Sequence, residues 1–351
     1  MTRTWRVAVL GLGHWYSAYG LARSLHEYPA AELVAASWHD TAQLEEFTGT
    51  FGIRGYRTAA ELLAQEDVDI VHIASPVSEL YQLTLLAAQA GKHIVLGKPM
   101  AMSCAQADAM VEAVERSGVV CLPFQGLMRL RSASLKERIV RGEIGDIVLL
   151  HQTSRWSIAE DWYHSGRPGW FVDPRHVPGG AFIDEGIYWI DLFRWLAESE
   201  VVQVDARMGN LVHKDIQVED WGMATFTFAS GVIATLEAAW TVTAPRPTGP
   251  SPKQNAVVRL EVVGARGEIV DQWFRDPGRA VLAAGARDWA FERHAQEPFA
   301  PPTPVPLHQL IQAIEEGRQP AATIRDARDA FVVAMAAYES ARDGQPVRLS
   351  W

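Results

Sequence analysis

The first apolar run of the chain, residues 5–13, reads Trp5-Arg6-Val7-Ala8-Val9-Leu10-Gly11-Leu12-Gly13. Its first six residues form a short β-rich segment that stops at glycine, and a helical pattern follows the second glycine. Two glycines in a strand-to-helix turn let the backbone bend tightly and come close to a pyrophosphate at the helix N-terminus. The stretch therefore predicts the first βα unit of a dinucleotide-binding sheet.

The same rhythm of strand and helix continues through the first third of the chain. Strands are predicted at 5–10, 32–37, 69–74, 92–96 and 118–122, with amphipathic stretches between them. A helix at 104–117 begins after Ser103, has Gln106 in capping-box position and ends at Gly118. Alternation of this kind implies parallel strands joined by right-handed helical crossovers. We expect a doubly wound Rossmann domain over residues 1–122.

The pattern changes after Pro123. The predicted elements are helices at 133–141, 184–196 and 325–342 and strands at 147–153, 201–207, 222–228, 231–240 and 256–263. The strands alternate polar and apolar residues and are separated by turn signals, which is typical of a sheet with helices on one face. We expect a C-terminal α+β domain over residues 123–351, with an open, mostly antiparallel sheet. The proline-rich segments 244–254 and 297–306 are expected to be extended surface connections.

Composition excludes several classes of function. The chain has 351 residues, a net charge of −10 and 48% hydrophobic residues, which suits two acidic globular domains. Negative charge disfavours nucleic acid and anionic membranes as partners, and no apolar stretch approaches the roughly 20 residues of a membrane helix. Cys104 and Cys121 are too few for a disulfide framework, and no secretory signal is evident. A cytoplasmic location is expected.

The glycine loop departs from the usual dinucleotide pattern at two positions. Tyr16 stands where the third glycine normally lets the helix pack closely on the strand. The acid that holds the ribose hydroxyls of NAD is expected at the end of the second strand, where the chain instead has Ser37-Trp38-His39 followed by Asp40. Without that acid a 2′-phosphate is not repelled, so the sequence favours NADP over NAD, with Trp38 against the adenine. Two glycines alone fit an ordinary turn about as well.

A second cluster of candidate residues concerns proton transfer. Lys98 follows a strand and is placed at the carboxyl edge of the sheet, where ligands of open α/β folds bind. Asp184, Tyr188 and Asp191 are spaced i, i+4, i+7 and share one face of a predicted helix. An ammonium beside a phenol favours the phenolate, so Tyr188 can relay a proton while Asp184 orients the partner. The plainer alternatives are a solvated lysine, a core tyrosine and an N-cap aspartate.

Aromatic residues gather in the long loop before the 184–196 helix. Arg155, Trp156, Trp162 and Trp170 offer ring faces and one guanidinium, which suit the apolar face and hydroxyls of a sugar. Ordinary packing between domains explains the tryptophans equally well. The histidines show no spacing typical of a metal site, so no metal is expected.

Taken together, these motifs resemble the glucose-fructose oxidoreductase, inositol dehydrogenase and rhizopine-catabolism family over almost the whole chain. The matching pieces are Gly11-Leu12-Gly13, Ala90-Gly91-Lys92-His93, Lys98-Pro99, Gly142-Glu143-Ile144-Gly145-Asp146, Gly179-Gly180, Asp184 with Gly186 and Tyr188, and Ala337-Tyr338-Glu339-Ser340-Ala341. The resemblance implies hydride transfer between NADP or NAD and a secondary alcohol of a sugar or polyol. It also implies homodimers or homotetramers built on the open sheet.

The resemblance also assigns residues. Lys98 matches the lysine of the family's Glu-Lys-Pro motif, Asp184 its aspartate, and Tyr188 the position of a catalytic histidine that a subgroup replaces with tyrosine. Gly97 replaces the glutamate of that motif, and Leu80 stands where a histidine often follows Ser75-Pro76. The expected cofactor-binding residues are Gly11, Gly13, His14, Trp15, Ser37, Trp38, His39, Ser75, Pro76 and Lys98, and the expected substrate residues are Arg155, Trp156, Trp162, Trp170, Asp184 and Tyr188.

Two other functions stay open at this point. A non-catalytic or regulatory sugar-binding homologue would keep the fold but lose effective cofactor binding, as the residues at positions 16, 38, 80 and 97 allow. A redox-neutral enzyme would hold NADP or NAD tightly and oxidise and then reduce one substrate.

Overall fold

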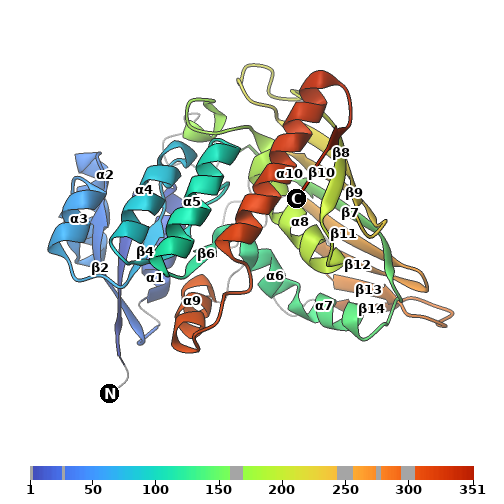
Figure 1. Ribbon diagram of the computed structural model, residues 1–351, viewed down its shortest axis with the longest axis horizontal. Coiled ribbons are helices and arrows are strands. Elements are labelled where there is room, and N and C mark those ends of the chain that lie inside the picture. Colours follow the sequence, from blue (N-terminus) through green and yellow to red (C-terminus); the bar gives the residue numbers. More distant parts are fainter. Residues whose placement is uncertain (1–2, 26–27, 159–168, 243–255, 274–277, 294–304) are drawn as a thin grey trace. The chain divides into compact units, whose positions relative to one another are not determined.

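The computed structural model describes residues 3–25, 28–158, 169–242, 256–273, 278–293 and 305–351. The chain divides into two compact units (Figure 1). The first unit comprises Met1–Gly126, Arg175–Pro178 and Pro301–Arg328, and the second comprises Leu127–Pro174, Gly179–Ala300 and Asp329–Trp351. A single cut after residue 122 therefore differs from the compact units, because two later segments return to the first one.

A six-stranded parallel sheet forms the centre of the first unit, in the order β3-β2-β1-β4-β5-β6. Its strands are β1 (Trp5–Leu10), β2 (Ala31–Ser37), β3 (Arg54–Tyr56), β4 (Ile70–Ile73), β5 (His93–Leu96) and β6 (Cys121–Pro123). The helices are α1 (Trp15–Leu25), α2 (Thr41–Phe51), α3 (Ala59–Gln65), α4 (Val77–Gln89), α5 (Cys104–Ser117) and α9 (Val305–Glu315). The strand order reverses between β1 and β4, which is the switch point of a Rossmann fold.

Helix ends in this unit follow the sequence signals closely. Ser103 accepts a hydrogen bond from the Gln106 amide at 3.3 Å, and α5 ends at Gly118 with φ +71°. The Gln106 side chain accepts from the Met102 amide at 3.0 Å, one residue before the expected partner. Asp40 caps α2 by accepting from the Gln43 amide at 3.0 Å. The first carboxylate after β2 is therefore engaged in holding a helix.

A nine-stranded mixed sheet dominates the second unit, in the order β14-β13-β12-β11-β7-β10-β9-β8-β15. The strands are β7 (Ile147–Arg155), β8 (Val201–Gly209), β9 (Trp221–Phe228), β10 (Ile233–Ala239), β11 (Val257–Gly264), β12 (Gly267–Trp273), β13 (Gly278–Leu282), β14 (Ala290–Arg293) and β15 (Val347–Arg348). Within this described sheet the β7–β10 pair is parallel and the other pairs are antiparallel.

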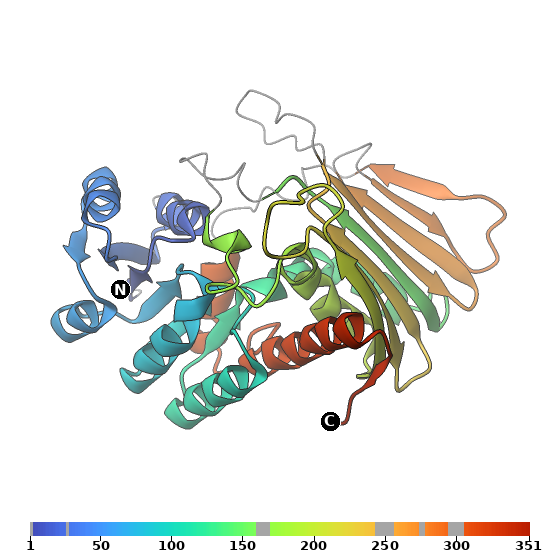
Figure 2. The same cartoon turned by 90° about the horizontal axis from the view of Figure 1, so that it is seen from above.

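The helices of this unit are α6 (Leu127–Arg131), α7 (Ala133–Val140), α8 (Ala181–Ala197) and the part of α10 (Ile324–Asp343) that starts at Asp329. Helix α8 packs on one face of the sheet (Figure 2). A Cβ at Gly186 would lie 3.0 Å from Leu236, and one at Gly222 would lie 2.7 Å from Phe182. Strand β9 alternates buried and more exposed residues, as expected for a sheet covered on one side.

Several elements differ from those expected. Helix α8 begins at Ala181, three residues before the predicted start, and β3, β12, β13, β14 and α9 were not foreseen. Segment 244–254 lies outside the described residues, as does most of 297–306, whose last two residues begin α9. None of the helices the structure describes has both the length and the apolarity needed to cross a membrane.

Candidate functional site

A shallow, open hollow lies at the carboxyl ends of β1, β2 and β4 in the first unit. This edge, beside the switch point, is where open α/β sheets bind ligands. The hollow is lined by Gly11, Ser37, Trp38, His39, Arg57, Ala59, Ser75, Glu79 and Leu83. The structure therefore gathers five of the predicted cofactor residues around one space.

The glycine loop beside this hollow has no room for side chains. Gly11 has φ +88°, and a Cβ there would lie 1.8 Å from Ser75 Oγ. A Cβ at Gly13 would lie 2.6 Å from Pro76 Cδ. The Gly11 amide donates to the Ser37 carbonyl at 2.8 Å, which fixes the turn against β2. A cradle of bare backbone that a methyl group would fill fits the close approach of a pyrophosphate.

Tyr16 does not disturb this loop. Its hydroxyl hydrogen-bonds His14 Nε2 at 3.0 Å, and the two rings lie 4.3 Å apart. Helix α1 packs into the core through Ala18, Leu21 and Ala22. A bulky residue at the position of the third glycine is therefore accommodated by the direction of its side chain.

Strand β2 contributes no carboxylate to the lining of the hollow. Trp38 is 8% exposed, and its indole Nε1 donates to Gln43 Oε1 at 2.7 Å, while its ring packs against His39. The charged side chains lining the hollow are Arg57, which follows β3, and Glu79 in the first turn of α4. Arg57 was missed because β3 has only three residues. Arg57 is recognised as a lining residue from the residues that surround it in the fold, and not from its neighbours in the sequence.

Lys98 lies at the same edge of the sheet and is 4% exposed, so it is not a solvated strand-end lysine. Burial, with the charges of Lys98 and His72, lowers the pKa of His14 well below its usual value. Burial lowers the pKa of His72 to about 4. Both imidazoles are thus neutral near neutral pH, and His72 Nε2 pairs with Ser17 Oγ at 2.8 Å.

The two departures from the family pattern near Lys98, at Gly97 and Leu80, lie next to each other in the fold. A Cβ at Gly97 would lie 3.1 Å from the Ile73 carbonyl oxygen and 3.5 Å from Leu80 Cδ2. Leu80 is 1% exposed and fills this space. The leucine and the glycine therefore form one compensated pair.

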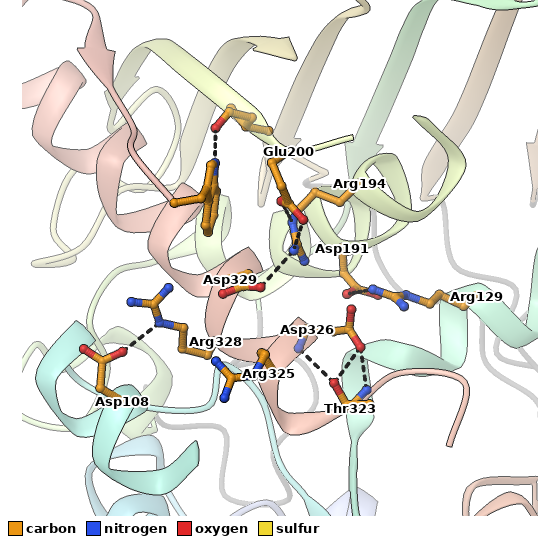
Figure 3. A network of polar contacts seen from close by, with 12 residues as sticks. Asp108, Arg129, Asp191, Arg194, Glu200, Thr323, Arg325, Asp326, Arg328 and Asp329 are labelled. Atoms are coloured by element: carbon orange, nitrogen blue, oxygen red, sulfur yellow. Dashed lines mark hydrogen bonds and ion pairs between the residues drawn. The ribbon is translucent and has the colours of Figure 1, made fainter. Parts of the chain in front are cut away.

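The polar stripe on α8 separates into two parts. Asp191 is fully buried and forms a two-pronged ion pair with Arg129 of α6, at 2.7 and 2.8 Å (Figure 3). Burial lowers the pKa of Arg131 on the same helix, while an electrostatic interaction with Tyr188 raises it. Asp191 is thus a structural anchor. Tyr188 lies near a cation that the sequence analysis did not single out.

The start of α8 is held by Glu219, another residue that the sequence analysis missed. Its carboxylate accepts from the Gly180 amide at 2.9 Å, the Phe182 amide at 3.0 Å and the Tyr338 hydroxyl at 2.7 Å. Burial raises the pKa of Glu219, and these hydrogen bonds oppose the rise. Asp184 lies within the first turn and is 4% exposed, so it is not the N-cap residue.

The predicted sugar-binding residues that the structure describes have different surroundings. Arg155 pairs with Glu237 at 2.5 Å on the sheet face opposite α8, so it is not placed with Asp184 and Tyr188. Trp156 is buried and donates to Ser154 Oγ at 2.9 Å. Trp170 stacks on Phe171 with ring centroids 3.8 Å apart. Trp162 lies outside the described residues.

Lys98 thus belongs to the first unit, and Asp184 and Tyr188 belong to the second. Among the residues that the structure describes, no three His, Cys, Asp or Glu side chains are placed to hold a metal ion.

A Rossmann sheet with a bare glycine cradle, followed by a mixed-sheet unit, defines the class of two-domain dinucleotide-binding oxidoreductases. Residues 5–124 match an oxidoreductase family with an NAD-binding Rossmann fold, and residues 132–270 match the GFO/IDH/MocA C-terminal domain. The chain belongs to this GFO/IDH/MocA family.

Two relatives and one solved structure match the chain along almost its whole length. Scyllo-inositol 2-dehydrogenase (NAD(+)) of Bacillus subtilis is 28% identical, over 98% of this chain and 96% of the relative. Myo-inositol 2-dehydrogenase of Thermotoga maritima is 26% identical, over 98% of each. The structure of aldose-aldose oxidoreductase from Caulobacter crescentus, complexed with glycerol, has a TM-score of 0.80 at 25% identity, over 99% of this chain and 100% of that one.

Proposed function

We propose that the protein is an NAD(P)-dependent oxidoreductase that transfers a hydride between a nicotinamide cofactor and a secondary alcohol or carbonyl of a sugar, polyol or related cyclic substrate. The observation that carries the proposal is the glycine cradle at the hollow, with buried Lys98 on the same sheet edge. The sugar and polyol chemistry in the names of the relatives supports the substrate class.

The bound nicotinamide would supply the carbon that accepts or donates the hydride. Lys98 and Tyr188 would hold and move the hydroxyl proton, with tyrosine in place of the family's histidine. Arg131 interacts electrostatically with Tyr188, so a cation lies near this proposed proton-transfer residue. Asp184, buried in the first turn of α8, would orient the substrate.

The proton-transfer assignment is tested by Tyr188→Phe and Lys98→Ala. Each is expected to lower kcat by on the order of 10²-fold, because the lost group acts on the proton, and Tyr188→Phe is expected to leave cofactor affinity near wild type. Lys92→Ala, at the other end of β5, and Tyr28→Phe serve as matched controls with unchanged kcat. Unchanged turnover in both test variants would rule the assignment out.

We further propose that the cofactor is NADP in preference to NAD, since Ser37, His39 and Arg57 line the hollow and no acid comes from β2. Arg57→Ala is expected to weaken NADPH binding about ten-fold, or about 1.4 kcal/mol, and to leave NADH binding unchanged. Arg54→Ala, at the start of β3 three residues earlier and paired with Glu66, is the control. Tighter binding of NADH than of NADPH by the wild type would overturn the proposed preference.

Titration with NADH and NADPH, together with mass spectrometry of the purified protein, decides between the proposed enzyme and its alternatives. A non-catalytic sugar-binding homologue would bind neither NADH nor NADPH. A redox-neutral enzyme would carry nucleotide as purified, visible by mass spectrometry, without net turnover. We also propose that the protein is a cytoplasmic homodimer or homotetramer joined through the sheet face opposite α8. Sedimentation of the purified protein would test the oligomeric state.

A further inference from the structure

Gln125 is a buried amide with unsatisfied hydrogen-bonding groups. Its side chain is 0% exposed, and in the part of the chain that the structure describes neither its oxygen nor its nitrogen has a hydrogen-bond partner. An unsatisfied buried polar group destabilises the folded state, and most buried amides avoid that cost. A residue kept in this state calls for an external partner.

The parallel register shows where Gln125 lies. Ile73 pairs with Leu96, and Leu96 pairs with Pro123, so β4, β5 and β6 end in one row. Ser75, Lys98 and Gln125 each follow that row by two residues. Gln125 is therefore the third residue of a series that begins with Ser75, beside the glycine cradle, and continues with Lys98, the proposed catalytic lysine.

A dinucleotide bound across a doubly wound sheet places its two halves on the two sides of the switch point. The hollow with Trp38 and Arg57 is on the β1–β3 side and suits the adenosine half. The β4–β6 side is left for the nicotinamide half, and Gln125 ends this side of the sheet. The residue is thus placed for the half of the cofactor that reacts.

Nicotinamide carries a primary carboxamide with one acceptor oxygen and one donor NH₂ group. A glutamine side chain offers the same pair, so two amides can satisfy each other through two hydrogen bonds. We propose that Gln125 binds the carboxamide of the nicotinamide ring and thereby fixes the ring's orientation beside Lys98. This inference rests on the proposed use of a nicotinamide cofactor.

The test compares three probes by isothermal titration calorimetry: the oxidised cofactor that the wild type binds more tightly, its 3-acetylpyridine analogue, and the matching ADP-ribose. The analogue replaces the NH₂ donor with methyl, and ADP-ribose lacks the ring. In the volume-matched Gln125→Met variant, cofactor binding is expected to weaken about ten-fold and ADP-ribose binding to stay unchanged. Wild-type preference for the cofactor over the analogue is expected to fall to within about two-fold.

Gln152→Met is the matched control, since Gln152 is a buried glutamine of β7 with one unsatisfied oxygen. It is expected to bind all three probes like the wild type. Gln125→Asn, which keeps the amide, provides a second variant if Gln125→Met does not fold. Equal weakening for cofactor and ADP-ribose, or unchanged discrimination against the analogue, would overturn the inference while leaving the proposed function intact. Failure of the wild type to bind any probe would instead remove the proposed function.

Discussion

His72 shows at the scale of one residue how burial near the site controls stability. The unfolded imidazole takes up a proton as the pH falls below about 6.5, whereas burial delays this in the folded protein until about pH 4. The unfolded state therefore binds more protons between these values, and stability is lost as the pH falls through that window. We expect His72 to account for about 2 kcal/mol of lost unfolding free energy between about pH 7 and about pH 5.

The measurement is urea unfolding at both pH values, for the wild type and for His72→Gln, which keeps a hydrogen-bonding group near Ser17 but does not titrate. The variant is expected to lose less stability on acidification, by the amount assigned to His72. His151→Gln, an exposed histidine on β7, is the control and is expected to behave like the wild type. Identical acid sensitivity of His72→Gln and the wild type would contradict the prediction.

The sequence identified residues whose immediate neighbours carry a signal. Lys98 was placed by the strand before it, and Asp184 and Tyr188 by helical spacing. Arg57 and Arg131 were missed because their surroundings come from other elements: Arg57 lines a hollow built by β1, β2 and α4, and Arg131 interacts with a tyrosine of α8. Burial and charge of this kind become visible only once the fold is known.

At the scale of elements, the residues at the ends of helices and strands decided how closely the sequence predicted their bounds. Five of the six strands of the first sheet, all but β3, were predicted with ends within three residues of those observed, because glycines and capping residues mark them. Helix α8 was placed three residues late because its first turn is capped by Glu219, which follows in the sequence by almost forty residues. A cap that comes from a distant segment leaves no signal at the helix itself.

Short or polar elements were missed for a related reason. Strand β14 is exposed along its whole length, so it shows no alternation of buried and exposed residues. Helix α9 follows a proline-rich segment and starts with Val305-Pro306, which suggested a connection and not a helix. Proline is nevertheless well tolerated in the first turn of a helix.

At the scale of the whole molecule, the chain leaves the first unit and later returns to complete it. Leu307, Leu310 and Ile311 of α9 are at most 2% exposed and belong to the same core as Trp5 and Leu25. Trp5 also donates to Glu315 at 3.1 Å. The core of the first unit includes α9, which comes from a segment about 180 residues further along the chain. The stability of this unit should therefore depend on α9.

A fragment of residues 1–126 is therefore expected not to fold cooperatively, since it leaves the α9 side of the core open to water. Each buried leucine or isoleucine that is missing removes roughly 2–5 kcal/mol, comparable to the stability of a small domain. The same fragment joined through a flexible linker to residues 301–328 is expected to regain a sharp thermal transition. Thermal unfolding followed by circular dichroism makes the comparison. If residues 1–126 alone unfold as sharply and at the same temperature as the joined fragment, α9 is an accessory to the first unit and not part of its core.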